Sequence, residues 1–170
     1  GKHVSIFVKK RIRRKYAGRL GLIIPIGFHL APKEKSFNML EISKKIKLFA
    51  FDLDGTLYLG ENLIEGAIEL ISFLKKNYKV VFFTNNSTKT RKEIFCKLNN
   101  FGFECDLNEV FTSSYATAKY LSESNIKNVF VIGSKGLRSE VLDKEISIVE
   151  NDSAENLVVG LDFNFSYKKI

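Results

Sequence analysis

The sequence predicts an α/β fold in which a Rossmann-like parallel sheet is flanked by helices. Four short apolar runs, at 46–51, 79–83, 109–111 and 128–132, have the length of strands. None of them alternates between apolar and polar residues, which is typical of strands covered on both faces. Helical patterns separate the first three runs and follow the third, and this alternation of strands and helices favours a parallel sheet.

Three helices are predicted from apolar spacing and from their end signals. The first pattern stops at Asn77 and is made by Ile64, Ala67, Ile68, Ile71 and Leu74. For the second helix, Thr90 and Glu93 fit a capping box at the start, and Gly102 suits the C-terminal end. A third helix is predicted over 114–121. Its inward-facing residues are Tyr115, Ala118 and Leu121.

Each of the first three strands ends in side chains that can bind a ligand. Asp52 and Asp54 follow the first strand, Thr84, Asn85 and Asn86 follow the second, and Thr112 and Ser113 follow the third. In an open parallel sheet, ligands bind beyond the carboxyl ends of the strands. Two like charges at the end of an apolar segment are costly unless a cation or a reaction uses them. We therefore expect two of these three clusters to converge on one site.

The body of the chain offers few residue types for catalysis. Both histidines, His3 and His29, lie near the N-terminus, so the body can build neither a Ser-His-Asp triad nor a His-ligated zinc site. Cys96 and Cys105 fit no metal pattern or disulfide framework, and we expect free thiols in a reducing compartment. No GxxxxGK[ST] motif occurs. The remaining carboxylates favour a hard cation such as Mg²⁺.

Charge divides the chain into a basic leader and a nearly neutral body. The chain has 170 residues, 45% hydrophobic and 27% charged, which is a globular composition. Residues 1–38 hold ten Lys/Arg and one acidic residue, a net charge of +9. Residues 39–170 hold the other 17 Lys/Arg and 18 acidic residues, a net charge of −1. A break this sharp marks a boundary, and no apolar run approaches the ~20 residues of a membrane span.

The leader is open to several interpretations. Its basic cluster could bind nucleic acid or an anionic membrane, and its Arg-rich, acid-poor character resembles a transit peptide to an organelle. The apolar stretch at 20–31 could be a signal core, but it lacks a clean small-residue cleavage site. Alternatively, the leader is not native, since the only methionine, Met39, begins a plausible approach to the first strand. We favour this last interpretation and expect a leader that is disordered or not native.

Several motifs of the body resemble the haloacid dehalogenase-like superfamily of hydrolases. DLDGT at 52–56 and FFTNNS at 82–87 are similar to its first two motifs. TNNSTKTR, FTSSYATAKYL, VFVIGSKGLRSEV and VVGLDFNFSYKKI resemble its 4-nitrophenylphosphatase/phosphoglycolate phosphatase-like branch, subfamily IIA, over about 47–170. This resemblance implies a cytoplasmic, Mg²⁺-dependent phosphomonoester hydrolase that acts on a small phosphorylated metabolite through an aspartyl-phosphate.

The resemblance also implies roles for single residues. Asp52 matches the nucleophile that attacks phosphorus, and Asp54 matches the general acid and base. Mg²⁺ would be held by the Asp52 side chain and the backbone carbonyl of Asp54, together with a later acidic residue. Thr84, Asn85 and Asn86 match the groups that hold the transferred phosphoryl group. An Asp at position 54 favours phosphoester hydrolysis over the reactions of the superfamily's transport ATPases and dehalogenases.

Two later motifs of the family have no match in this chain. They are a Lys that steadies the phosphoenzyme and an acidic pair, typically within GDxxxTD, that completes the Mg²⁺ site. The chain therefore resembles a C-terminally truncated member, with the first part of the core domain at 39–126 and a partial inserted α/β cap domain at 127–170. Residues 162–167 (DFNFSY) could contribute to substrate choice or form a strand-to-helix turn. Such a fragment is expected to be inactive alone, and it could form a homo-oligomer through the cap.

The missing motifs and the leader leave an alternative open. The chain could be a non-catalytic, degenerate haloacid dehalogenase-like domain, or a nucleic-acid-binding module that uses its basic arm. We expect no nucleic-acid partner for the nearly neutral body. A Lys and a GDxxxTD-like motif in the downstream reading frame would favour the enzyme.

Overall fold

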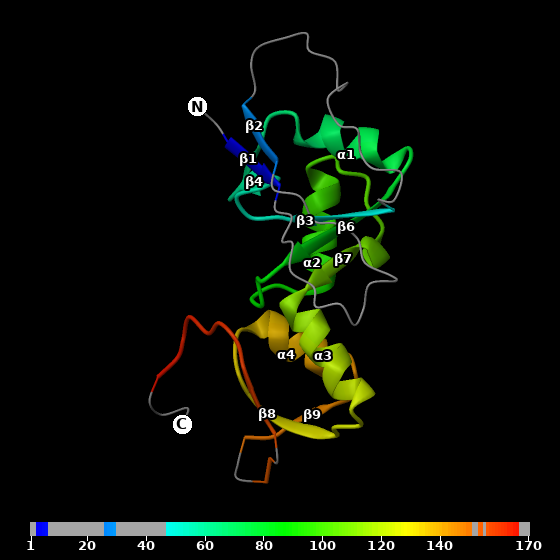
Figure 1. Ribbon diagram of the computed structural model, residues 1–170. Coiled ribbons are helices and arrows are strands. Elements are labelled where there is room, and N and C mark those ends of the chain that lie inside the picture. Colours follow the sequence, from blue (N-terminus) through cyan, green and yellow to red (C-terminus); the bar gives the residue numbers. More distant parts are fainter. Residues whose placement is uncertain (1–2, 7–25, 30–46, 151–152, 155, 167–170) are drawn as a thin grey trace, which may run out of the picture. The chain divides into compact units, whose positions relative to one another are not determined.

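The computed structural model describes residues 3–6, 26–29, 47–150, 153–154 and 156–166 (Figure 1). The chain divides into two compact units, residues 1–83 and residues 84–170, which are described in turn. None of the helices in the described ranges is long and apolar enough to cross a membrane.

The first unit contains a parallel pair of strands joined through a helix. β3 (Leu48–Asp52) pairs with β6 (Lys79–Thr84), and α1 (Ala67–Lys75) lies between them in sequence. The apolar runs predict this strand–helix–strand unit, and the observed strands differ from the prediction by one or two residues at their ends. The helix ends near the predicted position, where the Asn77 N–H donates to the Leu74 carbonyl at 3.1 Å.

Side chains of β3 and β6 are buried at alternate positions rather than on both faces. Phe51 is 1% exposed and Phe82 is 0% exposed, whereas Ala50 and Val81 are only half-buried. The prediction that both faces are covered is therefore wrong for the described residues. A run of apolar side chains specifies a strand, but it does not fix how much of the second face is covered. α1 adds a buried stripe to the core, made of Ala67, Leu70, Ile71 and Leu74.

A short hairpin follows β3 that the apolar runs do not predict. β4 (Tyr58–Leu59) pairs antiparallel with β5 (Asn62–Leu63). Gly60, at the turn, has a φ of 61°, a left-handed conformation that glycine adopts without strain. Strands of two residues are too short to leave a periodic pattern, so Gly60 is the one local signal for this turn.

Two strands lie within the predicted leader. β1 (His3–Ile6) and β2 (Ile26–His29) pair antiparallel and form a two-stranded sheet of their own. The rest of 1–38 lies outside the described residues. The expectation that the leader is disordered or not native stays a prediction.

The second unit begins with the predicted capped helix, α2 (Arg91–Asn100). The Thr90 hydroxyl accepts a hydrogen bond from the Glu93 N–H at 3.1 Å, and the Glu93 carboxylate accepts one from the Thr90 N–H at 2.7 Å. This reciprocal pair is the capping box that the sequence predicts. Gly102 follows the end of the helix with a φ of 94°, which satisfies the predicted glycine stop.

A 3₁₀ turn, a strand and a helix come next. They are η2 (Leu107–Glu109), β7 (Val110–Thr112) and α3 (Ser113–Glu123). On α3, Ala118 and Leu121 are buried as predicted, and Tyr115 is half-buried. Cys96 is exposed on α2 and Cys105 is buried in the following loop, and the described structure joins neither of them in a disulfide.

The second unit ends in a parallel three-stranded sheet of order β10-β8-β9. The three strands are β8 (Asn128–Ile132), β9 (Ser147–Ile148) and β10 (Leu157–Val159), and α4 (Lys135–Leu142) lies between β8 and β9 in sequence. α3 and α4 pack side by side (Figure 1). One core joins these helices to the sheet, formed by Ala118, Leu121, Val129, Val131, Leu137, Val141, Ile146 and Val158. The α/β class with parallel strands is confirmed in both units.

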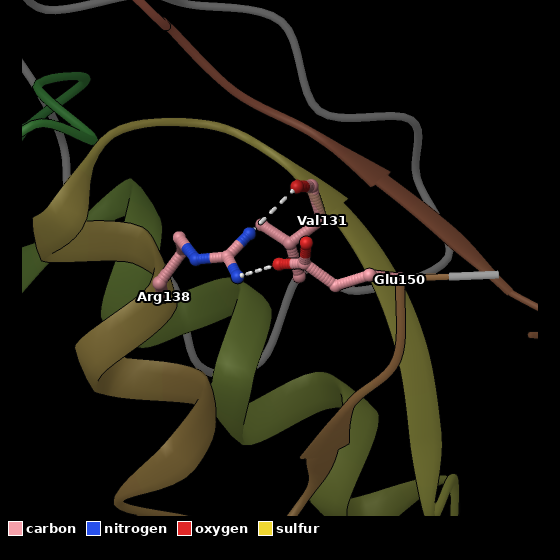
Figure 2. A network of polar contacts seen from close by, with 3 residues as sticks. All are labelled: Val131, Arg138 and Glu150. Carbon is pink, nitrogen blue, oxygen red and sulfur yellow. Dashed lines mark hydrogen bonds and ion pairs between the residues drawn. The ribbon is translucent and has the colours of Figure 1, made fainter. Parts of the chain in front are cut away.

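Arg138 of α4 links β8 to the segment after β9. Its guanidinium donates to the carbonyl of Val131 at 3.1 Å and to the carboxylate of Glu150 at 2.6 Å. Figure 2 shows the three residues and these two contacts. The Glu150 side chain is 74% exposed, so this ion pair is worth at most about 1 kcal/mol. The bond to the backbone carbonyl is the part that fixes Arg138 against β8.

Candidate functional site

Asp52 is the last residue of β3, and the burial of its neighbours sets its direction. Phe51 is 1% exposed and Leu53 is 0% exposed, while Asp52 itself is exposed. Because successive side chains of a strand point to opposite faces, burying Phe51 and Leu53 turns the carboxylate outward. The strand is therefore a rigid support for this group.

A tight loop around the Leu53 carbonyl carries the second carboxylate, Asp54. The Thr56 N–H donates to that carbonyl at 3.1 Å. Gly55 has a φ of 80°, so the sharp turn uses a conformation that favours glycine. Asp52 and Asp54 thus lie two residues apart on one hydrogen-bonded loop.

Opposing effects act on the carboxyl group of Asp52. Partial burial is the largest effect and raises its pKa. The Leu53 N–H and the Thr56 hydroxyl donate hydrogen bonds to this carboxylate and lower the pKa, whereas the negative charge of Asp54 raises it. The net result is a pKa above the ordinary aspartate value. A cation beside the two carboxylates would offset this electrostatic cost.

Thr56 and Tyr58 also interact with the two carboxylates, but neither is among the residues predicted for the site. Thr56 is 3% exposed and Tyr58 is 1% exposed. Burial, followed by the charges of Asp54, Asp52 and Glu61, raises the pKa of the Tyr58 phenol, which stays neutral at physiological pH. The final threonine of DLDGT was a signal for Thr56. The local pattern does not distinguish Tyr58 from any other core aromatic residue.

Thr84 ends β6 at the edge of the strand pair where Asp52 ends β3. The register pairs Asp52 with Phe83, and Thr84 is the next residue along the chain. Thr84 is 6% exposed, and its hydroxyl oxygen accepts a hydrogen bond from the Asn86 N–H at 3.1 Å. The register therefore places the ends of β3 and β6 beside each other. Convergence of the two clusters on one site stays a prediction. The roles of these residues stay predictions.

Hydrogen bonds fix the loop that follows β6. The Asn86 amide oxygen accepts bonds from the Thr88 N–H at 2.8 Å and the Thr88 hydroxyl at 2.6 Å. Since these donors engage the oxygen, the NH₂ of Asn86 is the part that could donate to an anion. The Asn85 carbonyl accepts a bond from the Ser113 hydroxyl at 2.8 Å. Asn85 and Asn86 therefore lie in an ordered turn that is also held from α3.

The loop with Asp52 and Asp54 offers the oxygen ligands that a hard cation prefers, but too few of them to complete its coordination. The Asp52 carboxylate and the Asp54 carbonyl are donors that Mg²⁺ prefers. In the part of the chain that the structure describes, no three His, Cys, Asp or Glu side chains are grouped so that they could hold a metal ion. A Mg²⁺ ion at this loop would need further oxygen ligands, from water, phosphate or elsewhere in the protein.

Comparison with known proteins agrees with the motifs. Residues 49–147 match the family of haloacid dehalogenase-like hydrolases. The chain belongs to this family. The matched region contains the loop with Asp52 and Asp54 and the turn at Thr84, Asn85 and Asn86.

Relatives place the chain near the phosphatases of the haloacid dehalogenase-like family. An acid sugar phosphatase of Staphylococcus haemolyticus is 36% identical over 130 residues, which is 75% of this chain and 49% of that protein. The solved p-nitrophenyl phosphatase from Archaeoglobus fulgidus has a TM-score of 0.69 and 30% identity, over 72% of this chain and 48% of its own. A solved 4-nitrophenylphosphatase from Thermotoga maritima has a TM-score of 0.68 and 32% identity, and the match covers 73% of this chain and 48% of that protein.

These similarities confirm the predicted family, its 4-nitrophenylphosphatase-like branch and the α/β fold. The chain spans about half the length of the curated relatives that it matches.

Proposed function

We propose that this chain is part of a Mg²⁺-dependent phosphomonoester hydrolase that acts on a small phosphorylated metabolite through an aspartyl-phosphate. The observation that carries the proposal is the loop after β3. There the Leu53 N–H and the Thr56 hydroxyl hold the Asp52 carboxylate, two residues before Asp54. Relatives named acid sugar phosphatase and p-nitrophenyl phosphatase support the reaction class.

In the first step, a carboxylate oxygen of Asp52 attacks phosphorus, and the bond between phosphorus and the leaving oxygen breaks. The carboxyl group of Asp54 gives its proton to that leaving oxygen. The hydrogen bonds from Leu53 and Thr56 restrict the rotation of the Asp52 side chain. This restriction brings the attacking oxygen to phosphorus at low entropic cost.

In the second step, water attacks the phosphorus of the aspartyl-phosphate. Asp54, now ionised, accepts a proton from that water. The bond between phosphorus and the Asp52 oxygen breaks, which releases inorganic phosphate and restores both side chains. One loop thus supplies the nucleophile and the proton carrier for both steps.

Other groups would bind the phosphoryl oxygens and the metal ion. When bound, Mg²⁺ supplies the positive charge that allows one anion to attack another. The Asp52 side chain and the Asp54 carbonyl would hold it. The Thr84 hydroxyl and the amide groups of Asn85 and Asn86 would donate to the phosphoryl oxygens.

The test compares two substitutions in the protein expressed from its complete reading frame. Asp52→Asn removes the anionic nucleophile, so hydrolysis of every phosphoester should fall to background. Asp54→Asn removes only the proton donor. Its effect should be small for 4-nitrophenyl phosphate, whose leaving group needs no proton, and about 10²–10⁴-fold for an alkyl phosphate.

The control is Asp143→Asn, which changes an exposed carboxylate after α4 and should leave both rates unchanged. Retained turnover in Asp52→Asn, with metal contamination and wild-type carry-over excluded, would contradict the mechanism. Equal losses for the two leaving groups in Asp54→Asn would deny Asp54 its role as an acid.

The proposal extends to the organisation of the protein. Residues 39–126 would form the first part of the core domain. Residues 127–170 would form part of the cap domain, through which the protein could form a homo-oligomer. A cytoplasmic location belongs to the same proposal, as does the expectation that the nearly neutral body binds no nucleic acid.

A further inference from the structure

The first turn of α4 lies directly against the loop that follows β6. At Gly136, an added Cβ atom would stand 2.5 Å from the carbonyl oxygen of Thr88 and 2.6 Å from the backbone nitrogen of Lys89. Both obstacles are backbone atoms, so a side chain could fit only if the loop or the helix moved. Gly136 thus allows a close approach between α4 and residues 88–89.

One turn further along α4, a buried carboxylate contacts the end of the same loop. Glu140 is 6% exposed, and its Oε1 accepts a hydrogen bond from the backbone N–H of Arg91 at 2.5 Å. Arg91 is the first residue of α2, and a helix cannot satisfy its own first N–H groups. Glu140 supplies an acceptor there, and its negative charge suits the positive end of the helix dipole.

The Arg91 side chain is committed to the fold as well. Its Nε donates to the Val110 carbonyl at 2.9 Å, and its guanidinium lies 4.1 Å from the ring centroid of Tyr115. Glu140 therefore acts on a helix start whose side chain is already fixed. A small movement of the start of α2 would be transmitted through the backbone to the loop that precedes it.

Three further hydrogen bonds hold the loop from other elements. Ser113 and Ser114, at the start of α3, donate to the carbonyls of Asn85 and Lys89 at 2.8 and 3.1 Å. The Leu161 N–H, after β10, donates to the Ser87 hydroxyl oxygen at 3.2 Å. These bonds hold the loop along its length, and the Glu140 carboxylate fixes its exit into α2.

We propose that Glu140, assisted by the close packing at Gly136, is a positioning residue for the phosphate-binding turn at Thr84, Asn85 and Asn86. This inference rests on the proposed function, because it assigns a role to a residue through that turn. Glu140 acts through the start of α2 and does not itself touch the phosphoryl group. By linkage, phosphate bound at the turn would in return stabilise the contact between Glu140 and Arg91.

Hydrogen exchange of the protein from the complete reading frame tests this role. The probe is inorganic phosphate with Mg²⁺, and peptides that cover 84–91 are compared with peptides from β8. Glu140→Ala should speed amide exchange in 84–91 by about fivefold to tenfold, which is the change expected when one hydrogen bond is lost. The same variant should also show weaker protection of 84–91 by phosphate. Glu140→Gln keeps an oxygen acceptor, so its exchange rate at 84–91 and its protection by phosphate should both be close to those of the wild type.

The control is Asp143→Ala, which removes an exposed carboxylate at the end of the same helix and should change neither segment. If Glu140→Ala does not fold, Glu140→Asp shortens the side chain by one carbon and should give a smaller change in the same direction. Unchanged exchange at 84–91, or an equal increase in β8, would overturn the role of Glu140 alone. If phosphate does not slow exchange at 84–91 in the wild-type protein, the turn does not bind phosphate. That result would also overturn this role of Glu140.

Discussion

At Asp52, the fold holds a carboxylate in a place that disfavours its charge. Partial burial and the nearby charge of Asp54 act against ionisation, and the hydrogen bonds from Leu53 and Thr56 offset only part of that effect. A chain selected only for stability would have no reason to place two carboxylates on one loop. The cost becomes useful if a cation or a phosphoryl group binds there.

Asp52→Asn should therefore stabilise the protein at neutral pH. Because the folded state raises the pKa of Asp52, protonation favours folding. This contribution is fully present below the pKa of the unfolded chain and is lost as the pH rises through the folded pKa. Asn does not titrate and can still accept the hydrogen bonds, so thermal melts should show an advantage for the variant that grows as the pH rises from acidic to neutral.

The exposed Asp143→Asn should show no such trend. An Asp52→Asn variant that is less stable than the wild type at neutral pH, without metal, would mean that the hydrogen bonds outweigh the electrostatic cost.

Among the glycines of the described residues, Gly136 has the strongest steric reason to lack a side chain. Gly136→Ala should destabilise the chain by about 1–3 kcal/mol, since the new methyl group meets the backbone at residues 88 and 89. Gly133→Ala is the matched control, because there the new atom meets the flexible end of Leu137 at 2.8 Å. Urea denaturation should rank the Gly133 variant as the milder of the two, and the reverse order would contradict the steric argument.

Among the elements, those with strong local signals could be predicted, and those fixed by packing could not. α2 was predicted from Thr90, Glu93 and Gly102 because caps are made by residues close in sequence. The hairpin of β4 and β5 was missed because two-residue strands have no period. The contact between Glu140 and Arg91 was also missed, since 49 residues separate its partners and only the packing of α4 brings them together.

The capping box of α2 gives a prediction of pH dependence with the opposite sign to that of Asp52. Hydrogen bonds from the Thr90 N–H and hydroxyl lower the pKa of Glu93. Its contribution to stability is present above the unfolded pKa and is lost as the pH falls through the folded pKa. Glu93→Gln should weaken this acid-induced loss in urea melts, and Thr90→Ala should cost about 1 kcal/mol at neutral pH.

Lys92→Ala, at an exposed position in the same turn, is the control and should leave the pH dependence unchanged. If Glu93→Gln has the same acid profile as the wild type, other carboxylates govern that part of the curve.

At the scale of the whole chain, the family and the class of fold could be predicted because the motifs lie at strand ends. DLDGT begins at the last residue of β3, and TNNS begins at the last residue of β6. At these ends a parallel sheet presents its ligand-binding edge. The later catalytic groups could not be assigned, since this chain covers about half of each relative that it matches. The choice of substrate depends on long-range packing, for which a local pattern gives no signal.

Because the charge breaks at residue 38, we expect a chain beginning at Met39 to keep the fold and melting behaviour of the longer chain. β1 and β2 pair with each other in a separate two-stranded sheet, and such a pair adds little stability on its own. The two chains should therefore give the same melting temperature, and neither should bind DNA or RNA in a salt-sensitive way. The removed segment carries a net charge of +9, so it is the part of the chain in which a nucleic-acid affinity would reside. A steep fall of affinity with salt, seen only in the longer chain, would instead make the leader a nucleic-acid-binding arm, because the slope counts the phosphates that its Lys and Arg residues neutralise.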